Sequence, residues 1–273
     1  MDRTQSYALN KARWDEVVPL HAASPFYQVK EFLAGGKPLS KIERRELGDI
    51  AGKSLVHLQC HFGLDTLTLA RMGATVTGLD FSDKALAQAR SLAEQAGIPA
   101  RFVLGNLYDA PKLLGQRYDV AFVSWGAINW LPDIEAWARV VADVLEPGGF
   151  LYMIEGHPYA NILEQRVPGD AVVPTYPYWH KPEPLVFESD VSYTGEDTKV
   201  AHTKMHEWIH TISDIVNALI AAGLRLEFLN EHATLAWKLF PSMVEDKAEE
   251  GFYVMPEGFP KIPLAFSLKA VKE

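Results

Sequence analysis

A short turn between an apolar run and a helical pattern holds the residues best suited to bind a ligand. It lies within LVHLQCHFGLDTLTLA, residues 55–70, and Gly63 gives it one position where the backbone can approach a ligand closely. The helix that follows would offer free backbone N–H groups. Asp80 ends the next apolar run, seventeen residues after Gly63, where a carboxylate can accept hydrogen bonds from two ribose hydroxyls. This turn and this acid predict a nucleoside-containing cofactor.

A parallel sheet would bring these residues together. Short apolar runs alternate with segments of helical period, which is typical of βαβ units. The expected strands are residues 54–60, 75–80, 101–104, 118–125, 149–155, 225–233 and 263–272, and the expected helices are 64–72, 82–96, 132–146 and 211–224. Because the loops after parallel strands meet at one edge of the sheet, we expect an α/β fold with its chemistry at that edge.

The chain is expected to form a single domain with four parts. Residues 1–50 read as a helical cover with apolar positions such as Trp14 and Val18, and residues 51–155 read as the cofactor-binding core. Residues 156–210 are rich in proline and aromatic residues and are predicted to be a lid that also receives the acceptor. Residues 211–273 would supply the last helix and two C-terminal strands.

Composition excludes several classes of protein. The 273 residues are 48% hydrophobic, which excludes a disordered chain, and their net charge of −9 has the wrong sign for binding nucleic acid. Cys60 is the single cysteine, so no internal disulfide can form. No apolar run approaches the roughly 20 residues of a membrane-spanning helix. We expect a soluble cytoplasmic protein, a monomer or homodimer, that acts on a small molecule.

The same segments resemble the successive motifs of class I S-adenosylmethionine-dependent methyltransferases. The resemblance is carried by LVHLQCHFGLDTLTLARMGATVTGLDFS, LGNLYD, YDVAFVSWGAINWLPD and LEPGGFLYMIEGHP, which cover about residues 54–158 in the family's order. It implies a doubly wound, mostly parallel seven-stranded sheet, a Rossmann-like methyltransferase fold, in which an antiparallel seventh strand lies between the fifth and sixth. It also implies S-adenosylmethionine as cofactor.

The family's first motif is altered in this chain. An acidic residue and three glycines would fall at His57, Gln59, His61 and Gly63, and only Gly63 matches. The φ angles of Gln59 and His61 are expected to be negative, or tolerated if they are not, because neither residue has the freedom of glycine. The resemblance implies the following cofactor-binding residues: Tyr7, Trp14, Gln59, Cys60, His61, Gly63, Asp80, Phe81, Ser82, Asn106, Leu107, Ser124, Trp125 and Gly126.

Two residues just past the fifth expected strand are candidates for a general base. Glu155 and His157 carry groups that can titrate near neutral pH, although either could instead form a structural hydrogen bond at the strand end. Cys60 could be a nucleophile or an inert buried thiol. No metal site is predicted, because the segment with His202, His206 and His210 lacks a helical stripe and an acidic partner.

The aromatic and histidine side chains of the lid could line the acceptor pocket or could be local packing. They are Tyr176, Tyr178, Trp179, His180, His206 and Trp208. Residues 156–273 hold 10 basic and 17 acidic side chains, an excess that favours a neutral or cationic acceptor.

Two other functions stay open at this point. A nicotinamide-dependent oxidoreductase shares the turn and the acid, but the complete G-x-G-x-x-G motif is missing. A non-catalytic S-adenosylmethionine-binding module would explain the altered turn.

Overall fold

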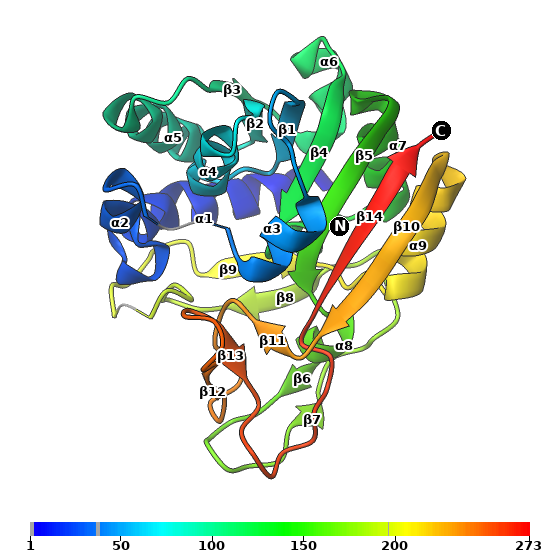
Figure 1. Cartoon of the computed structure of the whole chain (residues 1–273). Helices are drawn as coiled ribbons and strands as arrows, with labels where there is room; N and C mark the ends of the chain where they lie inside the picture. Colours follow the sequence, from blue (N-terminus) through cyan, green and yellow to red (C-terminus); the bar gives the residue numbers. More distant parts are fainter. Residues whose placement is uncertain (1–2, 37–38, 196) are drawn as a thin grey trace.

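A seven-stranded sheet forms the centre of the molecule (Figure 1). The computed structural model describes residues 3–36, 39–195 and 197–273. The strands are β1 (Ser54–Leu58), β2 (Thr75–Asp80), β3 (Arg101–Leu104), β4 (Tyr118–Ser124), β5 (Leu145–Gly156), β10 (Leu224–His232) and β14 (Ala265–Lys272), in the order β10-β14-β5-β4-β1-β2-β3. β14 is antiparallel to both β5 and β10, and the neighbours from β5 to β3 pair in parallel. The predicted doubly wound, mostly parallel sheet is confirmed.

Helices cover both faces of this sheet. One face carries α6 (Ala110–Leu114), α7 (Ile134–Val144) and α9 (Ile212–Ala221), and the buried Trp137 of α7 lies in the largest apolar cluster. The other face carries α3 (Lys41–Leu47), α4 (Leu64–Arg71) and α5 (Asp83–Ala96), with α1 (Arg3–Ala23) and α2 (Val29–Leu33) packed beside them (Figure 1). Single 3-10 turns lie at Pro25–Tyr27, Leu107–Asp109 and Ile128–Trp130.

Local capping explains where the long helices begin. The Ser82 side chain accepts the N–H of Ala85 at the start of α5, and the Asp133 side chain accepts that of Ala136 at the start of α7. Gly97, at φ 65°, ends α5 in the left-handed conformation that glycine adopts without strain. These signals were in the sequence, so the helix boundaries follow the predictions closely.

A two-stranded ribbon lies against the first helix. β8 (Leu185–Glu188) pairs with β9 (Lys204–Glu207), and Asn10 of α1 bonds to the backbone of His206 in both directions, through Nδ2 at 2.8 Å and Oδ1 at 2.9 Å. The amide of Asn10 therefore takes the place of a neighbouring strand. α1 and the ribbon together lie at the carboxyl ends of the parallel strands.

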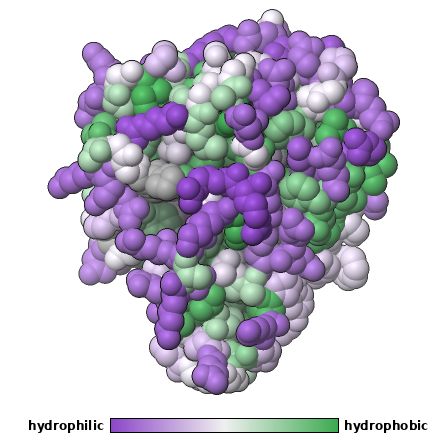
Figure 2. Space-filling model, in the orientation of Figure 1, coloured by the Kyte–Doolittle hydropathy of each residue, from purple (hydrophilic) through white to green (hydrophobic). Residues whose placement is uncertain are grey.

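A smaller lobe hangs below the sheet in Figure 1. It contains α8 (Pro158–Asn161), β6 (Leu163–Glu164), β7 (Val173–Pro174), β11 (Thr234–Leu235), β12 (Val244–Glu245) and β13 (Tyr253–Val254). Its own core includes Phe240 and Met243. Figure 2 shows apolar residues at the surface of this lobe among hydrophilic ones, and Val244 is 47% exposed. The sequence did not predict the three-stranded sheet of β11, β12 and β13, whose residues lie between β10 and β14 along the chain.

No helix within the described ranges is both long and apolar enough to cross a membrane.

Candidate functional site

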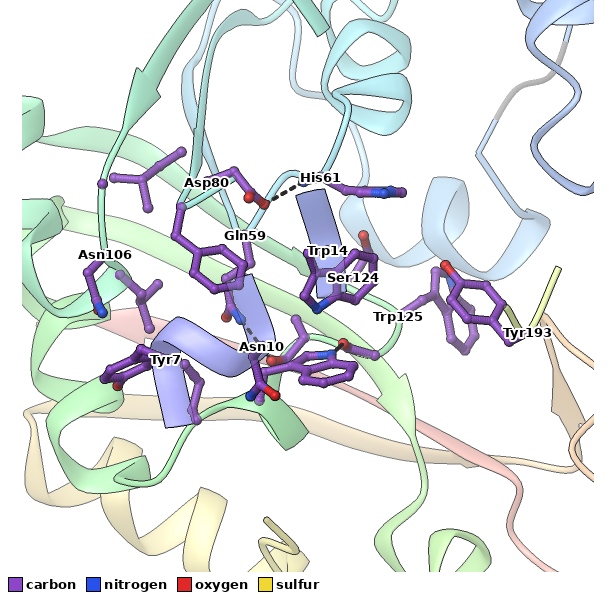
Figure 3. A pocket seen from close by; sticks show the side chains of 18 of the residues that line it. Tyr7, Asn10, Trp14, Gln59, His61, Asp80, Asn106, Ser124, Trp125 and Tyr193 are labelled. Atoms are coloured by element: carbon purple, nitrogen blue, oxygen red, sulfur yellow. Dashed lines mark hydrogen bonds between the residues drawn. The ribbon is translucent and has the colours of Figure 1, made fainter. Parts of the chain in front are cut away.

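A pocket opens at the carboxyl edge of the sheet, beneath α1 (Figure 3). Its empty space, which includes open solvent at the mouth, is about 760 Å³. It is lined by Tyr7, Asn10, Trp14, Tyr27, Gln59, His61, Leu79, Asp80, Phe81, Gly105, Asn106, Leu107, Ser124, Trp125, Gly126, Ala127, Trp130, Leu131 and Tyr193. The structure thus brings together all but three of the residues that the sequence suggested for cofactor binding.

Asp80 ends β2 at one side of the pocket. It is 6% exposed, and its carboxylate accepts the backbone N–H of His61 at 2.8 Å and that of Ser82 at 2.9 Å. Burial raises the pKa of Asp80 to about 6, although these N–H groups act in the opposite direction. Each carboxylate oxygen still has a lone pair that can accept a hydroxyl.

Asn106 and Tyr7 lie beside Asp80 at the same end of the pocket (Figure 3). Asn106 caps the turn at Leu107–Asp109, because its Oδ1 accepts the N–H of Tyr108 at 3.0 Å. The Tyr7 ring packs edge-on against Tyr108 with centroids 6.4 Å apart. Phe81 and Leu107 add apolar surface here. This end can therefore take a flat polar ring together with a hydroxylated sugar.

The altered turn keeps the backbone of a glycine-rich one. Gln59 and His61 have φ angles of 57° and 52°, so both adopt the left-handed conformation rather than the negative φ expected first. Hydrogen bonds hold this conformation: His61 donates its N–H to Asp80, and the Gln59 Nε2 donates to the Ala127 carbonyl at 2.8 Å. The side chains are tolerated because they lie along the pocket wall.

Three predicted cofactor residues lie outside the pocket lining. A Cβ on Gly63 would come within 2.9 Å of both Ala89 and Phe102, so this glycine permits close packing of α5. Ser82 caps α5 and donates its hydroxyl to Asp15. Cys60 is 3% exposed, and burial raises the pKa of its thiol well above the usual value, which gives no support to a nucleophile. Their contribution to the site is structural.

Glu155 stands behind the pocket wall instead of facing into it. It is 3% exposed, and its carboxylate accepts N–H groups from the loop after β4: Gly126 at 2.9 Å, Ala127, and Ile128 at 3.3 Å. Burial raises the pKa of Glu155, while these hydrogen bonds oppose the rise. The carboxylate therefore shapes the loop that carries Trp125 and Gly126.

His157 also lies away from the pocket lining. Its Nδ1 accepts the N–H of Tyr159 at the start of α8, and its Nε2 lies 3.0 Å from Glu231. The lid side chains named for the acceptor pocket are likewise placed elsewhere: His206 bonds to Ser6, and Trp208 bonds to the Pro182 carbonyl. Neither the base candidates nor the lid aromatics line this pocket, and their functional roles stay predictions.

The far end of the pocket is aromatic. Trp14 packs edge-on against His61 and Trp130, with ring centroids 5.1 and 5.3 Å apart. The hydroxyls of Tyr27 and Tyr193 are hydrogen-bonded to each other. Sequence reasoning missed Asn10, Tyr27, Leu79, Gly105, Ala127, Trp130, Leu131 and Tyr193 as lining residues. The spacing of Tyr7, Asn10 and Trp14 on one helical face was the available signal for Asn10.

A chain of hydrogen bonds ends at a carboxylate near Ser124. His57, whose pKa burial lowers to about 3, is a neutral ring. Its Nδ1 lies 2.9 Å from the Thr66 hydroxyl and its Nε2 lies 3.4 Å from the Ser124 hydroxyl, which donates to Asp65 at 3.3 Å. Since a carboxylate only accepts, the donors in this chain all point toward Asp65.

Known sequences match the central part of the chain. Residues 56–149 match the family described as a methyltransferase domain. The ubiquinone biosynthesis O-methyltransferase of Methylobacterium sp. (strain 4-46) is 28% identical over 141 residues, which cover 51% of this chain and 56% of that protein. The protein of the same name from Escherichia fergusonii is 34% identical over 124 residues, which cover 42% and 51% respectively. The chain spans about half the length of the curated relatives that it matches.

Solved structures match most of the chain. The S-adenosylmethionine-dependent methyltransferase from Mesorhizobium loti aligns with a TM-score of 0.57 and 22% identity, covering 85% of this chain and 96% of that one. The S-adenosylmethionine-dependent methyltransferase from Clostridium acetobutylicum ATCC 824 aligns with a TM-score of 0.56 and 13% identity, covering 85% and 88%. Structural matches at such low sequence identity establish the fold alone. The central part of the chain therefore matches a methyltransferase domain, and most of the chain has the fold of these S-adenosylmethionine-dependent methyltransferases.

Proposed function

We propose that the chain transfers a methyl group from S-adenosylmethionine to a small-molecule acceptor. The observation that carries this proposal is the position of Asp80, whose buried carboxylate ends β2 inside the pocket and beside Asn106. In a class I fold this pair suits the ribose and adenine of a nucleoside cofactor. The matched domain at residues 56–149 supports the same reading.

The residues present fit this cofactor. Asp80 would accept the two ribose hydroxyls, and Phe81, Leu107 and Tyr7 would enclose the adenine. Asn106 already uses one lone pair of Oδ1 on Tyr108, and the second lone pair would accept the adenine amine. The turn at Gln59 and His61 and the loop at Ser124–Gly126 would surround the methionine part of the cofactor.

When bound, the cofactor supplies a methyl group on a positively charged sulfur, which an in-line nucleophile can displace. The protein's contribution would be alignment and exclusion of water. Trp14, Trp130 and Tyr193 would form an apolar chamber for the acceptor beside the sulfur. The described lining includes no lysine or arginine, so this chamber favours a neutral or cationic acceptor.

If the acceptor's nucleophilic atom carries a proton, methyl transfer requires a group that accepts this proton. Ser124 lines the pocket and donates its hydroxyl to Asp65. An acceptor hydroxyl or ammonium that reached Ser124 would have a carboxylate one hydrogen bond away. Glu155 would not take the proton. Its role would be to hold the loop at Gly126 and Ala127, next to Ser124.

Formation of S-adenosylhomocysteine tests this proposal. The purified protein should convert methyl-labelled S-adenosylmethionine to S-adenosylhomocysteine only when an acceptor is added, with one label transferred per molecule formed. A panel of phenols and amines would define the acceptor. Cofactor binding without turnover on any of them would favour a non-catalytic module, and fluorescence enhancement of a reduced nicotinamide cofactor would favour an oxidoreductase.

A further inference from the structure

Trp125 joins the aromatic end of the pocket to the small lobe. It lines the pocket, and Figure 3 shows it with Tyr193 at the end away from Asp80. Its ring also packs edge-on against Trp237, with centroids 5.9 Å apart and planes at 89°, and against Phe252, at 5.8 Å and 71°. These two rings belong to the small lobe, no residue of which is part of the described pocket lining. The lobe therefore contacts a wall of the pocket from outside.

The backbone of Trp125 is fixed by the neighbouring strand. Its φ angle of 21° is one that a residue other than glycine rarely adopts. Its N–H donates to the Ile154 carbonyl of β5 at 2.9 Å, and the N–H of the next residue, Gly126, donates to Glu155. Because the backbone is held in this way, the direction of the Trp125 side chain depends on the rings that it packs against.

Trp237 lies tightly between the strand and the lobe. A Cβ on Gly156 would come within 3.1 Å of Cη2 and 3.2 Å of Cζ2 of its indole, so the glycine at the end of β5 lets this ring lie directly against the backbone. On the lobe, Trp237 packs against the apolar cluster that contains Leu235 and Phe240. Since close-packed side chains have little room to move, Trp237 gives the Trp125 ring a rigid support.

We propose that Trp125 contacts the methyl acceptor and that the small lobe, through Trp237 and Phe252, sets the size of the acceptor that fits. This inference rests on the proposed function. The other side chains at this end of the pocket are also aromatic, and such rings pack well against a flat apolar acceptor. Trp237 and Phe252 are positioning residues, because they act on the acceptor only through Trp125.

Acceptors that share a nucleophile but differ in size test the inference. Suitable pairs in the panel are phenol with naphthol and aniline with naphthylamine, and the quantity measured is the ratio of kcat/KM for the two-ring acceptor to that for the one-ring acceptor. Trp237→Leu leaves space into which Trp125 can move, so this ratio should rise by about tenfold or more. Affinity for S-adenosylhomocysteine should stay within about threefold of the wild-type value, because its nucleoside lies at the other end of the pocket.

Two further variants separate the ring contact from the stability of the lobe. Trp237→Phe keeps a ring against Trp125 and should bring the ratio to within about threefold of the wild-type value. Phe240→Leu is the matched control, because Phe240 is 1% exposed in the core of the same lobe and has no ring contact with Trp125 in the described part of the chain. It should lower the stability of the protein and leave the ratio unchanged.

Fluorine NMR of protein that carries fluorotryptophan tests the support without any acceptor. The Trp125 signal, identified by its loss in Trp125→Phe, should shift in Trp237→Leu and stay in place in Phe240→Leu. The inference is wrong if the signal or the ratio is unchanged in Trp237→Leu, or if Phe240→Leu changes the ratio as much. Failure of the proposed function gives a different result: the wild-type protein would form no S-adenosylhomocysteine with any acceptor, and the inference about its acceptor would fail with it.

Discussion

The Glu155 carboxylate accepts the backbone N–H of Gly126 at 2.9 Å and so ties the end of β5 to the loop that follows β4. The same carboxylate also accepts the N–H groups of Ala127 and Ile128. Trp125 has a φ angle of 21°, a value that a residue other than glycine needs support to maintain. Glu155 is therefore the residue that holds this wall of the pocket in shape.

Glu155→Gln should destabilise the protein and weaken ligand binding together. The amide would replace one accepting oxygen by a donor that faces N–H groups, at a cost of about 2–4 kcal/mol. Urea unfolding measures the loss, and Glu231→Gln is the control, since the Glu231 side chain is 57% exposed and should change stability by less than about 1 kcal/mol. Unchanged stability with lost turnover would instead restore Glu155 as a general base.

Gly63→Ala should be far more damaging than Gly97→Ala. Both glycines have positive φ, at 77° and 65°, but a Cβ at Gly63 meets Ala89 and Phe102 at 2.9 Å, whereas one at Gly97 meets nothing within 4 Å. We expect a loss of about 1 kcal/mol at Gly97 from the backbone alone and at least about 3 kcal/mol at Gly63. Thermal unfolding compares them. Equal losses would mean that the packing of α5 is not the constraint.

Affinity for S-adenosylhomocysteine should fall as the pH is lowered through about 6. Burial raises the pKa of Asp80 to that value, so below it the free protein carries a neutral carboxyl. The ionised form accepts ribose hydroxyls better, and binding would therefore weaken toward tenfold for each further pH unit. Calorimetry from pH 5 to 8 checks this. Asp80→Asn should show no such slope, and an identical slope in the variant would assign the titration to another group.

Arg13 should control how firmly the pocket is covered. It is 5% exposed and donates to the carbonyls of Ser189, Val191 and His202, in the segment that carries Tyr193 to the pocket. Arg13→Leu leaves the Ser189 and His202 carbonyls without this donor and leaves Val191 with only the Ser189 hydroxyl, so we expect faster proteolysis near Tyr193 and dissociation of S-adenosylhomocysteine roughly tenfold faster. Arg139→Leu, with a side chain 60% exposed, is the control. Unchanged dissociation would mean that Tyr193 plays no part in retention.

The sheet could be predicted because its signals are local. Residues 75–80 and 101–104 form strands with the expected bounds, and Ser82 and Asp133 cap helices as their sequence contexts indicate. The small lobe could not be predicted in the same way. Its strands at Thr234–Leu235 and Tyr253–Val254 are two residues long, too short for any alternation to register.

Pocket residues at the ends of strands could be predicted from the sequence. Residues that reach the pocket through tertiary packing could not. Asp80 follows from its place at the end of a strand after the turn at Gly63, and Ser124 follows from the resemblance to the methyltransferases. Tyr193 reaches the pocket through tertiary contacts, among them the hydrogen bond to Tyr27 and the Arg13 bond to Val191, and no spacing in the sequence encodes them. The sequence correctly predicted that Glu155 lies at the carboxyl edge of the sheet. The direction of its side chain, however, depends on the loop N–H groups that it binds.

Titration with S-adenosylhomocysteine at neutral pH tests the central claim most directly, because it asks whether the pocket beside Asp80 holds this nucleoside. The account predicts binding of one molecule per chain to the wild-type protein. It also predicts affinity lower by about 100-fold or more in Asp80→Ala, which loses two hydrogen bonds to a charged acceptor. No heat with the wild-type protein, or equal affinity in the variant, would contradict it.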